Sequence, residues 1–372
     1  WRDRSSEGRH PSFHFWQAYS PFSTWSKIWK GWQGCKESPE KLRTFYQQVL
    51  AEPYEAAHDK PDWEGLRDAM QSEPVKAAAR VVRGVVPDWA AVLTGSADQQ
   101  GDRIEWAVWA WGPGRRGARI DSGVIPISPA DPRAWVELAR VSATEYEGPA
   151  FAPRRCDRFC VDTGGHYTSE AYKAAHQFGI KAIKGAPNNP DAPPMTLSTT
   201  KGKYRNEQGR RVQGVPLFLI GTHNLKKAIY HGLAQTMLTA AGDGATIEPC
   251  SLFLPPDSAD ADYKQITAES LVEDVVNGRR VVKWTKAKQD SNEQLDLAVY
   301  ALAEAIGFGI DRFSTEQWFE LFSKRMKDPE LADMGPLEQM MRRGEPDLPA
   351  PQQAPRGEPD WVKKMKELNR NG

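Results

Sequence analysis

Three apolar segments of strand length follow one another in the middle of the chain, at residues 90–97, 104–111 and 118–125. Only short turn-rich segments separate them, and such short connections are typical of neighbouring antiparallel strands. Farther along, strand and helix patterns alternate up to a last apolar helix near residues 292–306. A meander followed by alternating helices and strands predicts an α/β fold, in which helices flank a mixed sheet.

Acidic residues end two of the strand patterns and interrupt the last helix pattern. Asp98 follows the first apolar segment, Asp162 follows the strand pattern at 158–161, and Asp296 lies inside the last helix. A carboxylate in apolar surroundings loses hydration and needs a cation or hydrogen-bond donors. Each of the three alone is equally compatible with a capping or surface role. Together, in this order, they favour a hard oxygen site for Mg²⁺ or Mn²⁺.

A Gly-Gly turn follows Asp162 and leads to His166. A lone histidine is more often structural than a ligand, but glycines allow the backbone to approach a phosphate or a metal closely. We therefore predict that His166 and Thr163 support the carboxylates without binding an ion directly.

The composition is ordinary for a soluble protein, with formal net charge +0 and 26% charged residues. At roughly 100–200 residues per domain, 372 residues allow one large domain with appendages, or two domains. No apolar run approaches the ~18 residues of a membrane span, so no membrane partner is expected. The chain opens Trp1-Arg2-Asp3 without a signal peptide, which indicates a fragment or a processed product. Its four cysteines favour buried free thiols in a reducing cytoplasm.

Both ends of the chain differ from its centre. Residues 1–85 are rich in aromatic side chains, which disordered linkers lack, so this arm is predicted to fold or to dock on a partner. Residues 86–310 form the predicted central domain. Residues 311–372 begin with a helix pattern, continue as a Pro-rich linker and end in a short amphipathic segment suited to folding on a partner.

Basic residues gather in two runs despite the balanced net charge. The first lies within residues 186–214, whose composition predicts a long mobile loop, and a loop of this length is usually functional or disordered. A charge run is usually a solvated face, but the second run immediately precedes the helix of Asp296, which favours contact with phosphates. An acidic stretch that includes Glu269 separates the two runs. The residues predicted to bind DNA are Lys201, Lys203, Arg205, Arg210, Arg211, Arg279, Arg280, Lys283, Lys286 and Lys288.

Two local motifs concern turns and helix ends. The glycine pattern at residues 112–117 matches that of dinucleotide sites, but it lies between two strands and therefore predicts a hairpin turn. Ser291 and Gln294 predict a capping box at the start of the last helix. No P-loop pattern occurs in the sequence.

At these residues the chain resembles the nuclease domain of phage terminase large subunits of the lambda type, the GpA-like family. The resemblance covers roughly residues 10–310. The matching stretches are TGSADQQGDRIE at 94–105, VDTGGH at 161–166, IKGA at 183–186 and NEQLDLAVYA at 292–301. The arm resembles the family's connector to its ATPase domain, at YSPF (19–22) and FYQQVLAEPY (45–54). Gln99 departs from the family, whose members more often carry an apolar residue beside this aspartate.

The resemblance implies a ribonuclease H-like fold and a DNA-packaging endonuclease that cuts concatemeric double-stranded DNA with two Mg²⁺ or Mn²⁺ ions. It implies that Asp98 bridges both ions and that Asp162 and Asp296 each hold one. The implied partners are an upstream ATPase domain, the terminase small subunit, and the portal or prohead through the C-terminal tail, all in the host cytoplasm. A site that contacts only phosphates carries little intrinsic sequence preference.

Two other classes of function stay open. One is a different ribonuclease H-like enzyme, such as a junction resolvase or a transposase, which a preference for branched DNA would distinguish. The other is a non-catalytic module that docks DNA or the portal and whose carboxylates are structural, which an absence of metal-dependent cleavage would support.

Overall fold

The computed structural model describes residues 15–35, 44–51, 62–186, 189–206, 208–241, 247, 250–276 and 279–327. The chain divides into two compact units. The smaller unit combines Trp1–Lys60 with Ser270–Thr285, and the larger unit combines Pro61–Glu269 with Lys286–Gly372. Residues 62–85, which the sequence groups with the N-terminal arm, fold within the larger unit. The Pro-rich linker and the amphipathic tail predicted beyond residue 327 lie outside the described residues.

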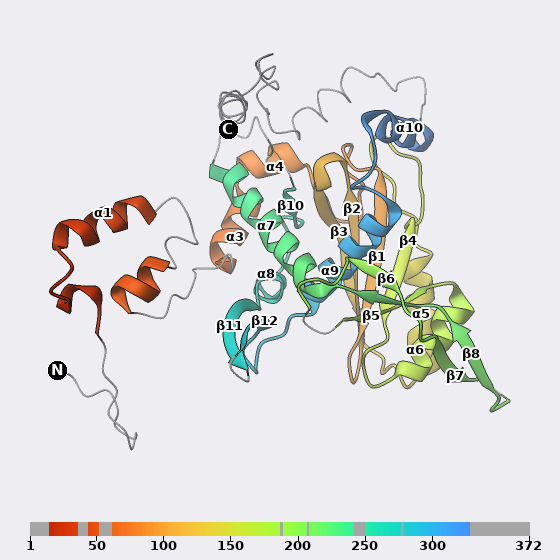
Figure 1. The fold of residues 1–372 in the computed structure, drawn as a ribbon. Helices are drawn as coiled ribbons and strands as arrows, with labels where there is room; N and C mark the ends of the chain where they lie inside the picture. Colours follow the sequence, from red (N-terminus) through yellow and green to blue (C-terminus); the bar gives the residue numbers. More distant parts are fainter. Residues whose placement is uncertain are drawn as a thin grey trace, which may run out of the picture. The chain divides into compact units, whose positions relative to one another are not determined.

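An eight-stranded mixed sheet forms the centre of the larger unit (Figure 1). Its strands are β1 Val92–Gln99, β2 Ile104–Trp111, β3 Gly117–Ile125, β4 Arg158–Asp162, β5 Lys181–Gly185, β6 Met195–Leu197, β9 Leu217–Ile220 and β10 Leu252–Phe253. They follow the order β10-β3-β2-β1-β4-β5-β9-β6. β1 pairs antiparallel with β2 and parallel with β4, and the parallel pairing continues through β5 to β9. The predicted α/β fold with a mixed sheet is confirmed.

Helices cover both faces of this sheet. On one face, Trp135 of α5 (Pro132–Ser142) and Ala174 of α6 (Thr168–Phe178) pack in one cluster with Ala97 of β1. On the other face lies α9 (Glu293–Phe308), which contacts α7 (Thr222–Ala241) and α8 (Asp260–Ile266). Successive strand residues point to opposite faces, so β1 serves both helical layers. The larger unit also contains α3 Trp63–Gln71, α4 Glu73–Ala79, η3 Pro113–Arg115 and α10 Thr315–Arg325.

Two hydroxyl groups of β1 fix α9 on the sheet. Thr94 Oγ1 donates to the carbonyl oxygen of Ala301 at 2.9 Å, and Ser96 Oγ donates to that of Leu297 at 2.8 Å. Both side chains are fully buried. A buried donor left without its acceptor costs about 1–3 kcal/mol, so these two bonds set the position of α9 along β1.

The segment at 186–214 is not one long loop, so this prediction was wrong. It contains β6, which pairs antiparallel with β9, and a hairpin of β7 (Gly202–Arg205) and β8 (Arg211–Val215). Tyr204 and Val215 of the hairpin pack against Tyr172 of α6. The hairpin is ordered because it buries these few apolar side chains, which a composition rich in Pro, Gly and Lys concealed.

The capping box predicted from Ser291 and Gln294 was also wrong. α9 begins at Glu293 with Asn292 as its N-cap, and the Asn292 side chain makes no capping hydrogen bond. Gln265 Oε1 instead accepts from the Gln294 N–H at 3.3 Å. The Asn292 amide bonds to Asp296 instead, and the Gln294 side chain accepts a hydrogen bond from Arg119. The glycine pattern at 112–117 does connect two antiparallel strands, β2 and β3, as predicted.

The smaller unit contains part of the aromatic arm and a separate hairpin. The arm forms η1 (Gln17–Tyr19), α1 (Trp25–Cys35) and the π-helical turn η2 (Tyr46–Leu50). Ile28 and Phe45 are buried together, with Trp32, Val49 and Leu50 packed against them. The hairpin consists of β11 Ser270–Val276 and β12 Arg279–Thr285. The described part of the arm therefore folds around Ile28 and Phe45, whereas Phe22, Trp25 and Trp29 stay exposed.

Two further sequence expectations concern membranes and cysteines. Within the ranges that the structure describes, no helix combines the length and apolar character of a bilayer span. Cys160 is a buried free thiol, and Cys156 and Cys250 are partly buried free thiols. Free rather than bridged cysteines were expected.

Candidate active site

Asp98 and Asp162 meet at the same end of neighbouring parallel strands. Ala97 of β1 pairs with Val161 of β4, so the next residue of each strand is an aspartate at the same level. Residues paired in this way point to the same face. Asp98 shares the face of Thr94 and Ser96, which is the face that α9 covers.

α9 brings Asp296 to this pair of carboxylates from its first turn. Burial raises the pKa of Asp98 well above its ordinary value, and the charges of Asp162, Asp296 and Glu293 raise it further. Burial also raises the pKa of Asp296, and the charge of Asp162 adds to this rise. The structure thus brings together the three aspartates that the sequence singled out.

Hydrogen-bond donors hold the two strand-end aspartates. The Gly164 backbone N–H donates to Asp162 Oδ1 at 3.0 Å, and the Tyr300 hydroxyl donates to Asp162 Oδ2 at 3.2 Å. Burial raises the pKa of Asp162, although these donors and Lys184 oppose the rise. Gln100 Nε2 donates to Asp98 Oδ2 at 2.8 Å. The donors orient both carboxylates without removing their charge.

Asp296 has a cationic partner. Lys226 Nζ of α7 lies 3.1 Å from Asp296 Oδ1, and Asn292 Nδ2 donates to Asp296 Oδ2 at 2.8 Å. The same ammonium lies 2.6 Å from Glu269 Oε1. Burial lowers the pKa of Lys226, but the charges of Asp296 and Glu269 outweigh this and raise it overall. Lys226 is therefore charged in the folded protein at neutral pH.

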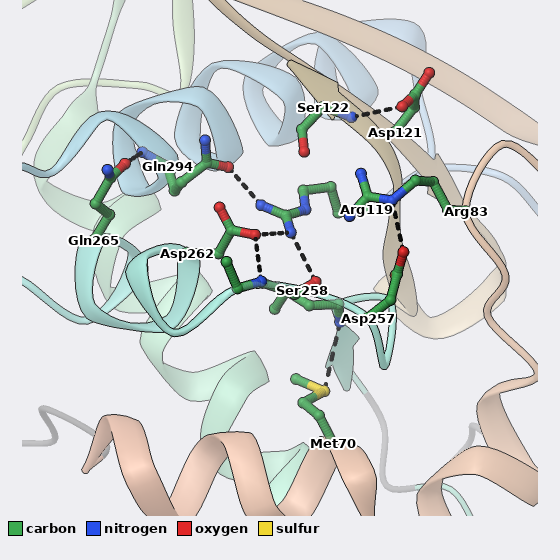
Figure 2. Close-up of polar contacts among 12 residues, drawn as sticks. Met70, Arg83, Arg119, Asp121, Ser122, Asp257, Ser258, Asp262, Gln265 and Gln294 are labelled. Carbon is green, nitrogen blue, oxygen red and sulfur yellow. Dashed lines mark hydrogen bonds and ion pairs between the residues drawn. The ribbon is translucent and has the colours of Figure 1, made fainter. Parts of the chain in front are cut away.

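A buried arginine anchors the first turn of α9 from below (Figure 2). Arg119 of β3 is 1% exposed and donates to Gln294 Oε1 of α9 at 2.6 Å. It also donates to Ser258 Oγ and to Asp262 Oδ2, each at 2.8 Å. These bonds connect the turn that carries Asp296 to β3 and to α8.

The chemistry of the three aspartates suits a hard divalent cation, because all their donors are carboxylate oxygens. In the part of the chain that the structure describes, however, no three His, Cys, Asp or Glu side chains form a cluster that holds a metal as arranged. Both oxygens of Asp296 contact Lys226 and Asn292 instead. The three carboxylates are thus the right type of ligand for a hard divalent ion, and Lys226 supplies positive charge beside them.

A family profile described as "Terminase large subunit gpA, endonuclease domain" matches residues 10–318. The chain belongs to this family. The terminase large subunit of Escherichia phage lambda is 34% identical over 329 residues, which cover 85% of this chain and 47% of the relative. The terminase large subunit of Enterobacteria phage P21 is 28% identical over 317 residues, which cover 83% of this chain and 45% of the relative. The chain spans about half the length of these relatives.

In this gpA endonuclease domain, the two predicted supporting residues have different surroundings. Thr163 is buried, and its hydroxyl donates to the Ile183 carbonyl oxygen of β5 at 2.8 Å. His166 is exposed on the turn between β4 and α6. Thr163 thus holds the backbone next to Asp162, whereas His166 faces solvent.

The predicted DNA-binding residues of the domain fall into separate places. Lys201, Lys203, Arg205, Arg210 and Arg211 are exposed on and beside the β7–β8 hairpin. In the second run, Arg279, Arg280 and Lys283 belong to β12 of the smaller unit, while Lys286 and Lys288 are exposed in the larger unit. The second run is therefore divided between the two units.

Sequence reasoning missed several side chains around the carboxylates. Glu269 was grouped with an acidic run, yet it is only 5% exposed and pairs with Lys226. Tyr300 lies four residues after Asp296 on the same helix, so helical spacing alone could have indicated it. Glu105 lies directly opposite Asp98 across β1 and β2, where Arg103 Nε donates to it at 2.8 Å.

Proposed function

We propose that this chain is the metal-dependent endodeoxyribonuclease of a viral DNA-packaging terminase, which cuts concatemeric double-stranded DNA. The observation that carries the proposal is geometric: Asp98 of β1 and Asp162 of β4 lie at the same level of neighbouring parallel strands in a family endonuclease domain, and α9 carries Asp296 in its first turn and bonds Asp162 through Tyr300. Three partly buried carboxylates, two of which raise the pKa of the third, are costly to keep charged unless a cation joins them.

Asp98, Asp162 and Asp296 would hold two Mg²⁺ or Mn²⁺ ions, with Asp98 shared between them. Two such ions activate the attacking water and stabilise the leaving oxygen of a phosphodiester. Tyr300 and Gly164 keep Asp162 oriented, and partial burial of the three carboxylates strengthens their interaction with any cation.

The proposed partners follow from the family. They are an ATPase domain in the same large subunit, the terminase small subunit, and the portal or prohead through the tail at residues 345–372. Such an enzyme works on viral DNA in the host cytoplasm.

The test is cleavage of supercoiled plasmid DNA with Mn²⁺, with Mg²⁺ and with EDTA. Nicked and linear products that require the divalent ion support the proposal. Cleavage confined to branched substrates would instead support a resolvase-type enzyme. DNA binding without cleavage under any of these conditions would support a docking module.

Divalent ions are expected to stabilise the fold more at pH 7.5 than at pH 5.5. The aspartates have raised pKa values in the folded state, so the folded state keeps protons that the unfolded state releases above about pH 4. The stability of the metal-free protein therefore falls as pH rises through the raised values. An ion at a hundred times its Kd adds about 2.7 kcal/mol. Thermal unfolding with Mg²⁺ or EDTA measures this, and an equal effect at both pH values would contradict it.

The β7–β8 hairpin is expected to contact DNA phosphates. Replacing Lys203, Arg205 and Arg211 by Gln should reduce the slope of log K against log salt by about 0.9 for each true contact. The control replaces Arg133 and Arg140, two exposed arginines of α5, and should leave the slope unchanged. Fluorescence anisotropy with duplex DNA measures both slopes. Equal slopes in the hairpin variant and the control variant would mean that the hairpin is a solvated surface that does not contact DNA.

A further inference from the structure

Three polar side chains with no role in the proposed reaction surround Asp296. Lys226 Nζ lies 3.1 Å from Asp296 Oδ1 and 2.6 Å from Glu269 Oε1. Asn292 Nδ2 donates to Asp296 Oδ2 at 2.8 Å and to the same Glu269 oxygen at 2.6 Å. Each carboxylate oxygen of Asp296 thus has its own donor, and both donors also bind Glu269 Oε1.

Glu269 is fixed in turn by Tyr230, one helical turn beyond Lys226 on α7. The Tyr230 hydroxyl donates to the Glu269 carbonyl oxygen at 2.6 Å and accepts from the Glu269 N–H at 3.1 Å. Lys226 is 8% exposed, Glu269 5% and Tyr230 2%. Charges this deeply buried are tolerated only with good partners, so α7 holds the ammonium in one place, between the two carboxylates.

We propose that Lys226 is a positioning residue for the nuclease reaction and that Glu269 holds it in place. The pair orients Asp296 and sets the local charge that a divalent ion meets at the three aspartates. This inference rests on the metal-dependent function proposed above.

The two members of the pair must affect ion binding in opposite directions. Loss of the Lys226 ammonium leaves Glu269 and Asp296 uncompensated, so the site becomes more negative and binds a divalent ion more tightly. Loss of the Glu269 charge leaves the ammonium to Asp296 alone, so the ion binds more weakly. A purely structural role would loosen the site in both cases and weaken binding in both.

The experiment measures Mn²⁺ binding by calorimetry and electron paramagnetic resonance at one fixed pH. We expect Lys226→Met to bind Mn²⁺ about tenfold more tightly and Glu269→Gln about tenfold more weakly, since one charge a few ångströms away has at least this effect. The double variant should return close to wild type. Lys227→Met removes the same charge from the next, exposed position of α7 and should change nothing. Both single variants should also cleave more slowly at saturating Mn²⁺, with KM for DNA unchanged.

The outcomes separate the two proposals. Suppose that wild type binds Mn²⁺ and that the Mn²⁺ affinities of the two folded single variants change in the same direction or not at all. The positioning role is then wrong, and the nuclease function stands. A wild-type protein that binds no Mn²⁺ overturns both. If Lys226→Met does not fold, Lys226→Arg keeps the charge and should retain the wild-type affinity, while Glu269→Gln alone must weaken binding.

Discussion

Replacing Asp98 with Asn is expected to abolish DNA cleavage, with a loss of at least about 10³-fold at saturating Mn²⁺, or about 4 kcal/mol of transition-state stabilisation. The charges of both other aspartates raise the pKa of Asp98, and Asp98 is the carboxylate that we propose to be shared by both ions. The amide keeps the shape of the side chain but carries no charge. Relaxation of supercoiled plasmid measures the rate.

The same substitution should not damage the fold. Because Asp98 is partly buried among like charges, its neutral amide relieves repulsion, and the metal-free variant should be at least as stable as wild type. The matched control is Asp102→Asn, whose side chain is 80% exposed in the turn after β1 and which should cleave normally. Activity within threefold of wild type in a folded Asp98→Asn protein would remove Asp98 from the site. Asp162→Asn and Asp296→Asn are expected to be inactive as well.

Replacing Arg119 with Met is expected to lower the free energy of unfolding by about 3–5 kcal/mol. The guanidinium is 1% exposed and bonds to Gln294, Ser258 and Asp262. Its loss removes the donor from the buried Gln294 and Ser258 side chains and the cationic partner from Asp262. The first turn of α9 loses an anchor at the same time, so cleavage should fall along with stability. Urea unfolding followed by circular dichroism measures the midpoint.

Arg140→Met is the control for the loss of an arginine. Arg140 is 71% exposed and pairs with Glu137, one turn earlier on α5. Exposed pairs of this kind contribute about 0.3–0.5 kcal/mol, so this variant should be nearly as stable as wild type. A loss below about 1 kcal/mol for Arg119→Met would show that the network in Figure 2 is not needed for the fold.

The strands were predictable because their signals are local. β2 was predicted with its observed bounds, and β1, β3 and β4 within two residues of theirs at each end, since apolar runs between turn-forming residues leave little choice. β7 and β8 were missed because their apolar side chains are few and gain their partner, Tyr172, only when α6 folds beside them. The start of α9 was misplaced because a capping pattern cannot reveal that Arg119 binds the Gln294 side chain.

For the site, sequence order located the carboxylates but not the side chains that hold them. Asp98 and Asp162 lie near the same ends of neighbouring parallel strands, and strand patterns predict where such ends fall. Lys226 is separated from Glu269 by 43 residues and Tyr300 from Asp162 by 138, so no local pattern connects them. Their pairing depends on how α7 and α9 pack, which follows from the completed fold. Their roles around the ions stay predictions.

The hydroxyl contacts between β1 and α9 fix the register of the helix along the strand, because the spacings of their donors and acceptors nearly match. Thr94 and Ser96 are two residues apart, or about 6.6 Å along a strand, and their acceptors Ala301 and Leu297 are four residues apart, or about 6 Å along a helix. One more step of two strand residues and four helix residues reaches Asp98 and Glu293, and the charge of Glu293 is one of those that raise the pKa of Asp98. A single inserted or deleted residue in β1 or in the first half of α9 would shift every later contact between the strand and the helix. In homologous chains, length variation should therefore collect in the β1–β2 and β2–β3 turns and leave these two elements unchanged.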